Sequence, residues 1–536
     1  MTDASDSSPE VAPLPSSGGE PTAPHGWPRI PRWMLCVLVL ALAVWRIDYV
    51  LGGIDPDSDA HAHFVIARSI LADPKDLSVH WVWLPLFHYL EAGAVWLGAS
   101  MQAIRFTNVG LAALAPLVLF AVLEPRTAGV PAADVALERA SVILACVLFA
   151  LNPIAMQMGT TGQMEPLFCL LVLFTAWSLD RGRPGLAAIP LSAAVLLRYE
   201  TWAVVPALLV HQLLARVPAI RRRLPEWERN ASTTGARAFL PIVLPALAVF
   251  LWAAVRRATV DDRWLGALRQ TREFANDAVG VTSSFSQGLS KIVHDGCLYL
   301  TRIPDRVMGV TLLLVPFGVF ASFRRDGLRW FAIYGSILSF LTLTWLLRAT
   351  LGLDRHFVAV GPFYALLAAR GAAELARAGR ALVRSLVKRF GEDRTKTEEF
   401  GWVSALVVGA LGLAAVGFGA HRLDTWMRDW RGASASVWPG RRRIAATLVQ
   451  ERPSRIFCNE ATVEVMSGLP REQFMRERVS TANVVAATAH GPVYLAVWGW
   501  ALKGLELPPS LRMAELDRTE GTAPFEGFFL VRVEPR

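Results

Sequence analysis

The sequence predicts an α-helical, polytopic membrane protein with about 11 transmembrane helices, followed by a small C-terminal α/β domain. Hydrophobic residues make up 53% of the 536-residue chain, charged residues only 18%, and the mean hydropathy is +0.37. Apolar windows of about 20 residues recur along the chain, and each is long enough to cross the hydrocarbon core of a bilayer. From His421 onward these windows stop, and the composition becomes that of a globular domain.

The net charge of +9 does not indicate a nucleic-acid-binding protein, because no basic domain carries interleaved aromatic residues. The basic residues collect in short stretches such as 180–183 and 370–399, which is typical of cytoplasmic loops. The 5 cysteines form neither a disulfide framework nor a zinc-binding pattern. Apolar spans flanked by basic loops make the lipid bilayer the expected partner, and we expect it to be the cytoplasmic (inner) membrane.

Residues 1–32 are rich in Ser, Pro, Gly and Ala, and they predict a disordered cytoplasmic tail rather than a signal peptide. Arg29 and Arg32 precede the first span, 33–51, so the N-terminus is expected inside and the following loop outside.

The outer loop, 52–105, contains a tryptophan-rich segment broken by proline, W-V-W-L-P-L-F-H-Y-L at 81–90. Such a segment favours a helix lying at the membrane interface. The alternative is a true crossing, which would move every later loop to the other side. With the interfacial interpretation, the next spans are expected at about 106–123, 140–160, 165–179, 186–197, 203–215, 238–255, 307–321 and 329–347, then one that ends near 370 and one at 401–418.

Three short apolar segments after His421 have the composition of β-strands: 454–459, 491–498 and 527–533. Helical and polar stretches separate them, so residues 421–536 are expected to form a small α/β domain. An odd number of crossings places this domain outside the cytoplasm.

The strongest candidate for a functional site follows the first span directly. There the chain carries Asp55, Asp57, Asp59, His61 and His63. Ionisable groups beside a bilayer are costly unless they serve a function. If a helix begins near Asp59, that residue and His63 share a face. The competing interpretation is that the acids only cap a short helix.

Further ionisable residues are expected at the same outer edge, namely His88, Glu165, Arg198, Glu200, Arg348, Asp354, Arg355 and His356. Carboxylates beside arginines supply a general base and an anion clamp, which phosphate chemistry on a lipid requires. The two-residue spacing of His61 and His63 disperses metal ligands on a helix, so neither a metal nor another cofactor is predicted.

The order of several motifs resembles that of the GT-C class of polyprenyl-phosphate-sugar glycosyltransferases, in the branch of the protein O-mannosyltransferases and aminoarabinose transferases. The motifs are D-x-D and A-R-S-I-L in the first outer loop, P-L-F-H-Y-L, W-L-G, A-I-R-F-T-N, E-P-L-F, L-L-R-Y-E-T-W and R-H-F-V-A-V-G-P-F. The resemblance covers roughly 33–420. One departure is Ala60, where many members of the class have Glu.

The resemblance implies an inverting, mannosyltransferase-like enzyme that moves a sugar from a polyprenyl-phosphate donor to a hydroxyl of a protein, lipid or glycan. Asp59, with Asp57 as the alternative, would be the catalytic base, and Glu165 would orient Asp59 or the acceptor. Arg355, Arg198 and His356 would hold the donor phosphate. Further candidate substrate-binding residues are His61, His63, His88 and Glu200.

Two alternative functions remain, a transporter or flippase of a lipid-linked saccharide and a non-catalytic scaffold. A transporter would place charged or broken helices near mid-membrane. The gathering of ionisable residues at one edge favours the enzyme.

Overall fold

A computed structural model describes residues 32–53, 57–124, 132–225, 228–229, 235–260, 264–279, 293–294, 296–347, 349–389, 401–519 and 527–536. Two features predicted from the sequence fall outside these ranges. One is almost all of the N-terminal tail, and the other is the pair Asp55 and Arg348.

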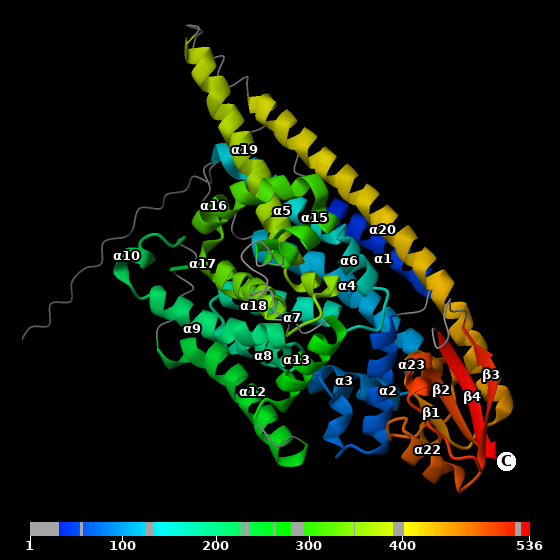
Figure 1. The fold of residues 1–536 in the computed structure, drawn as a ribbon. Coiled ribbons are helices and arrows are strands. Elements are labelled where there is room, and N and C mark those ends of the chain that lie inside the picture. The colour runs from blue at the N-terminus through cyan, green and yellow to red at the C-terminus, as the bar shows by residue number, and fades with distance from the viewer. Residues whose placement is uncertain are drawn as a thin grey trace, which may run out of the picture.

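Most of the described chain is a body of packed helices (Figure 1). Its principal helices are α1 (Arg32–Leu51), α4 (Met101–Leu123), α5 (Ala132–Ala150), α7 (Glu165–Asp180), α8 (Pro184–Val195), α9 (Val204–Leu214), α12 (Leu240–Thr259), α16 (Val315–Arg325), α18 (Ser336–Leu346), α19 (Gly361–Arg389) and α20 (Gly401–Glu451). One large apolar core runs through the body and includes Leu119, Leu173, Tyr334 and Leu366, each almost fully buried.

Four stretches of the described helices are long and apolar enough to cross a bilayer: Trp33–Leu51, Met101–Leu123, Ala236–Thr259 and Leu298–Arg325. The last of these combines several short helices that follow one another without a loop. The length and composition of these helices are those of a membrane protein. The full set of about 11 crossings stays a prediction.

The tryptophan-rich segment forms the short 3₁₀ helix η1 (Leu77–His80) and then α3 (Pro85–Trp96), which has 12 residues. At 1.5 Å per residue, α3 is roughly 18 Å long, too short to cross the hydrocarbon core. It packs beside α2 (Ser58–Ala72), at the same end of the molecule (Figure 1).

The segment predicted as one span at 140–160 is instead two helices, α5 and the short α6 (Pro153–Met158). Asn152 separates them, and its side chain accepts hydrogen bonds from the backbone N–H groups of Ile154 and Ala155. The break follows from the Asn-Pro dipeptide, since a residue before proline avoids the helical conformation and proline has no N–H to donate.

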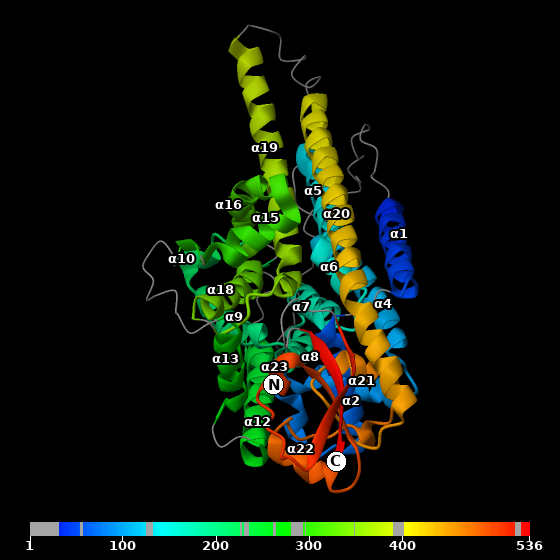
Figure 2. The ribbon, with the colours of Figure 1, turned by 45° about the vertical axis from the view of Figure 1, so that its right-hand side comes forward.

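The hydropathy pattern predicts that the last span ends at 418, but helix α20 is longer. It continues through the expected domain boundary at His421 and ends at Glu451, a length of 51 residues. Both views show it running along the flank of the body down to the C-terminal sheet (Figures 1 and 2). Ile444, Ala445 and Leu448 of α20 pack against the sheet, so the end of this helix belongs to the core of the C-terminal domain.

The C-terminal domain contains a four-stranded sheet of order β1-β2-β4-β3. Strands β1 (Ile456–Cys458), β2 (Val493–Trp498) and β4 (Phe528–Pro535) lie in the three segments predicted as strands. The β1–β2 pair is parallel, and the other pairs are antiparallel. Strand β3 (Leu511–Arg518) was not predicted, because it is an edge strand in which charged residues interrupt the apolar ones.

This domain is docked on helix α2. His61 Nδ1 lies 2.9 Å from the Thr462 hydroxyl, which belongs to α21 (Ala461–Ser467). Arg68 donates to the Leu469 carbonyl at 3.0 Å, and Arg471 donates to the Ser69 hydroxyl at 3.1 Å. The C-terminal domain therefore helps to hold the helix that follows the first span.

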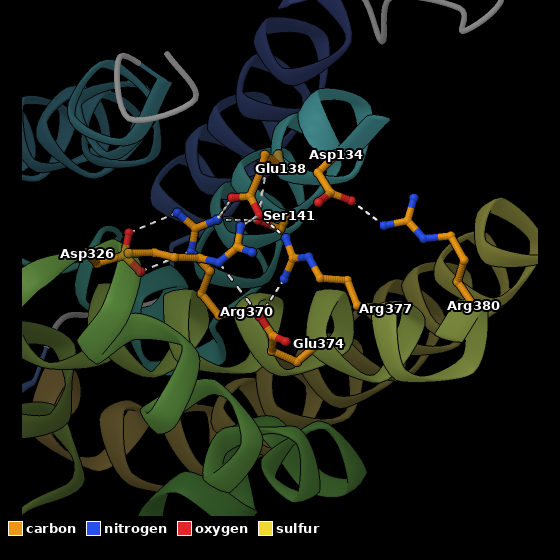
Figure 3. A network of polar contacts seen from close by, with 9 residues as sticks. Asp134, Glu138, Ser141, Asp326, Arg370, Glu374, Arg377 and Arg380 are labelled. Atoms are coloured by element: carbon orange, nitrogen blue, oxygen red, sulfur yellow. Dashed lines mark hydrogen bonds and ion pairs between the residues drawn. The ribbon is translucent and has the colours of Figure 1, made fainter. Parts of the chain in front are cut away.

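At the opposite end of the body, a buried ionic network joins α5, α16 and α19 (Figure 3). Arg370 donates to both carboxylate oxygens of Asp326, at 3.0 and 2.8 Å, and to the Ser141 hydroxyl at 2.9 Å. Glu138 forms ion pairs with Arg370 and Arg377. These buried charges stabilise one another, so each depends on its partners remaining in place.

We predict that Arg370→Met lowers the free energy of unfolding by about 3–5 kcal/mol, because it removes the arginine that bridges the buried carboxylates of Asp326 and Glu138. Arg384→Met removes an exposed arginine of the same helix and should change stability by no more than about 0.5 kcal/mol. Denaturant unfolding in detergent micelles measures both values. Equal stability of the two variants would contradict a stabilising role for the network.

Candidate active site

Helix α2 begins with the two acids that the sequence singles out. Asp57 is the N-cap, and its carboxylate accepts a hydrogen bond from the Asp59 backbone N–H at 2.8 Å. The capping interpretation is therefore correct for Asp57. Asp59 lies in the first helical turn, and its side chain is directed to a different partner.

That partner is Arg355, which comes from the 3₁₀ helix η9 (Asp354–Ala359), far along the chain. Its guanidinium forms an ion pair with Asp59, and it lies 3.5 Å from Asp57 Oδ2 and 3.7 Å from Glu165 Oε1. The arginine side chain is only 13% exposed. One largely buried cation thus gathers three carboxylates from the N-terminal ends of two helices, α2 and α7.

A second arginine extends the cluster. Arg198 donates to Glu165 Oε1 at 3.0 Å and forms a two-point contact with Glu200, at 2.6 and 3.2 Å. Glu165 is the first residue of α7, where the positive end of the helix dipole favours an acid. Asp59, Arg355, Glu165, Arg198 and Glu200 therefore form an alternating chain of charges.

His356 borders this chain of charges on the side of Tyr299. Its Nδ1 lies 3.2 Å from the Tyr299 hydroxyl, and the two rings are stacked. The electrostatic neighbours of His356 are Arg198, Glu200 and Arg355. The structure therefore brings His356 to the edge of the cluster.

Gln163 is a site residue that the sequence did not reveal. Its side chain is buried, and in the amide orientation that satisfies both ends, Oε1 accepts from Ala60 N and from Arg355 Nη1, both at 3.2 Å. A glutamine in T-T-G-Q-M-E gives no signal of such contacts, apart from its proximity to Glu165.

The loop that carries Gln163 is held by α4. Asn108 Nδ2 donates to the carbonyls of Thr161 and Gln163 at 2.8 and 2.6 Å, and Arg105 Nε donates to the Thr160 carbonyl at 2.9 Å. The polar residues of the A-I-R-F-T-N motif thus fix the position of this loop.

The paired histidines diverge. His61 points to Thr462 in the C-terminal domain, whereas His63 Nδ1 lies 2.8 Å from His88 Nε2 in α3. Across the described ranges, no group of three or more His, Cys, Asp and Glu residues is arranged to hold a metal ion.

The pKa values of the two acids of α2 shift in opposite directions. Burial alone would raise the pKa of Asp59, but the Arg355 guanidinium outweighs it, and the net effect is a lowered pKa. Burial raises the pKa of Asp57 and prevails over the more distant Arg355. The lowered pKa keeps Asp59 ionised near neutral pH, and an ionised acid can accept a proton.

Comparison with known proteins supports the fold. No protein-family model matches the sequence, and neither does any curated protein sequence. Among solved structures, ArnT from Cupriavidus metallidurans in the apo state is similar at 13% identity and a TM-score of 0.54, over 93% of this chain and 97% of that chain. The chain has a GT-C fold. The similarity covers nearly all of both chains, so it extends over the helical body and the C-terminal domain.

Two archaeal structures show weaker similarity. The Archaeoglobus fulgidus oligosaccharyltransferase tethered with an acceptor peptide has 11% identity and a TM-score of 0.47, over 83% of this chain and 60% of that one. The oligosaccharyltransferase AglB from the same organism, in complex with an inhibitory peptide and a dolichol-phosphate, has 11% identity and a TM-score of 0.44, over 83% of this chain and 61% of that one.

We predict that Arg355→Met raises the pKa of Asp59 from below its ordinary value of 3.8 to above it, because burial then acts unopposed by the guanidinium. Carboxyl ¹³C shifts of labelled aspartate, followed through a pH titration, measure this change, with Asp59→Asn used to assign the signal. An unchanged titration in Arg355→Met would show that Arg355 does not control Asp59.

Proposed function

We propose that this protein is an inverting glycosyltransferase that moves a sugar from a polyprenyl-phosphate donor to a hydroxyl acceptor at the outer face of the cytoplasmic membrane. The observation that carries the proposal is the convergence of Asp59, Asp57 and Glu165 on Arg355. A base beside a cation suited to phosphate is what this reaction requires. The GT-C fold is consistent with it.

In the proposed reaction, the acceptor oxygen attacks C1 of the sugar while Asp59 takes the hydroxyl proton. The bond between C1 and the phosphate oxygen breaks, and the electron pair leaves with the lipid phosphate. Arg355 and Arg198 stabilise the charge that develops on that phosphate, since guanidinium groups bind phosphate through paired hydrogen bonds. Attack opposite the leaving group inverts the configuration at C1.

The resting ion pair supports a further role for Arg355. An incoming phosphate competes with Asp59 for the same guanidinium, so donor binding weakens the Asp59–Arg355 contact. Loss of that contact raises the pKa of Asp59 and makes it a stronger base. Donor binding thereby prepares the base for the acceptor.

The transporter alternative has less support. The cluster of Asp59, Glu165, Arg198 and Arg355 lies beside helices α2 and η9 at the end of the body that carries the C-terminal domain, and its members are paired with one another. No feature of the described residues specifically favours a flippase.

We predict that Asp59→Asn lowers sugar transfer by about 100-fold to 10,000-fold, because asparagine cannot accept the hydroxyl proton. Binding of the donor lipid should be retained, since the arginines are unchanged. Purified protein in lipid nanodiscs, supplied with radiolabelled polyprenyl-phosphate sugars, provides the measurement.

The matched control is Asp73→Asn, which alters a half-exposed acid at the other end of α2. It should transfer sugar at the wild-type rate. If Asp59→Asn also transfers at that rate, Asp59 is not the base. If wild-type protein transfers none of the sugars offered yet moves the lipid across the bilayer, the transporter function replaces the enzyme.

A further inference from the structure

Three buried histidines form a continuous chain beside the candidate active site. They are His63 of α2, His80 at the end of η1 and His88 of α3, and each side chain is almost completely buried. His63 Nδ1 lies 2.8 Å from His88 Nε2, and His88 Nδ1 lies 2.8 Å from His80 Nδ1. Both ring nitrogens of His88 are therefore engaged by other histidines.

These contacts have the length of hydrogen bonds. Two nitrogens bound to one zinc ion would stand about 3.3 Å apart, because each lies 2.0–2.1 Å from the metal in a tetrahedral site. Each short N···N contact must instead hold one proton, donated by one ring and accepted by the next.

The rings are neutral near pH 7. Burial lowers the pKa of His63 to about 3 and that of His80 to about 4, and it also lowers the pKa of His88. A neutral imidazole carries a single N–H. The chain therefore has only two self-consistent arrangements, with every N–H pointing towards His80 or every N–H pointing towards His63.

One end of the chain reaches the candidate active site. His63 lies one helical turn after Asp59, whose charge favours the protonated ring, while Arg355 and Arg198 oppose it.

The other end lies beside a pocket. The His80 ring meets the edge of Trp252 at a centroid distance of 5.5 Å, and the charged groups that act on His80 are Arg256 and Asp76. Trp252 and Arg256 line a pocket together with Tyr199 and Trp202. His80 Nε2 is buried and has no hydrogen-bond partner among the described residues.

We propose that His63, His88 and His80 form a proton relay that carries the proton taken up by Asp59 away from the reacting sugar. This role rests on the proposed function. The proton passes from the Asp59 carboxyl to His63 Nε2. His63 Nδ1–H then donates to His88 Nε2, His88 Nδ1–H donates to His80 Nδ1, and the His80 Nε2 proton passes to water.

One proton enters and one leaves, so the charge of the chain is unchanged at the end of each passage. All N–H groups then point towards His63. Between turnovers, His63 Nε2 gives its proton to water in the emptied site and a proton from water enters at His80 Nε2, which restores the first arrangement. A neutral relay suits this site, because a persistent imidazolium would face Arg355 at one end and Arg256 at the other.

A first experiment tests the chain without reference to sugar transfer. Histidine labelled with ¹⁵N, in protein held in nanodiscs, should show neutral rings at pH 7 and two couplings across N–H···N hydrogen bonds. Both couplings should vanish in His88→Gln. Separate rings without these couplings would overturn the relay, whether or not the protein transfers sugar.

A second experiment tests the transport of protons. The side chain of His88→Gln fills similar space but cannot pass a proton from one atom to another, so kcat should fall by about 100-fold. The donor Kd should stay at the wild-type value, and added imidazole should restore part of kcat.

The matched control is His211→Gln, which changes another buried histidine, hydrogen-bonded to Glu228 at 2.7 Å and remote from this chain in sequence. It should lower the thermal midpoint yet leave kcat insensitive to imidazole. A wild-type kcat in His88→Gln would overturn the relay and assign the histidines a packing role. The same conclusion follows if kcat and donor affinity fall together and imidazole restores neither. If wild-type protein transfers no sugar while both couplings are present, the proposed function fails and the hydrogen-bonded chain stands.

Discussion

The ion pairs of Arg355 are the interaction on which the end of the body beside the C-terminal domain depends. Three carboxylates, Asp57, Asp59 and Glu165, would repel one another in a poorly hydrated site without a shared cation. The arginine therefore lowers the pKa of Asp59 and brings the N-terminal ends of α2 and α7 together. A guanidinium suits this task because its planar fork can contact several oxygens at once.

The surrounding fold supplies the rigidity that this interaction needs. Asn108 and Arg105 of α4 hold the loop before Glu165, and residues of the C-terminal domain, among them Thr462 and Arg471, hold α2. Asp59 is thus positioned between two elements that are remote from each other in the chain. The C-terminal domain therefore lies beside the site and also helps to hold it in place. Helix α20 connects this domain to the far end of the body (Figure 2).

The same arginine gives the proposed chemistry its order. While Arg355 is paired with Asp59, the acid is ionised but a weak base. A donor phosphate that takes over the guanidinium leaves the acid with a higher pKa at the moment when an acceptor proton must be removed. The histidine chain that starts at His63 then offers that proton a path through a region closed to solvent.

The sequence by itself determined the helical membrane class, three of the four strands and the order of motifs that resembles the GT-C class, because apolar periodicity and composition are local properties. It also named Asp59, Glu165 and Arg355, since charges beside a bilayer are conspicuous. Only the tertiary structure decided which of them meet, that His61 and His63 part, and that Gln163 and His80 join the site. Those contacts connect segments far apart in sequence, and no local pattern encodes the packing that brings them within hydrogen-bonding distance.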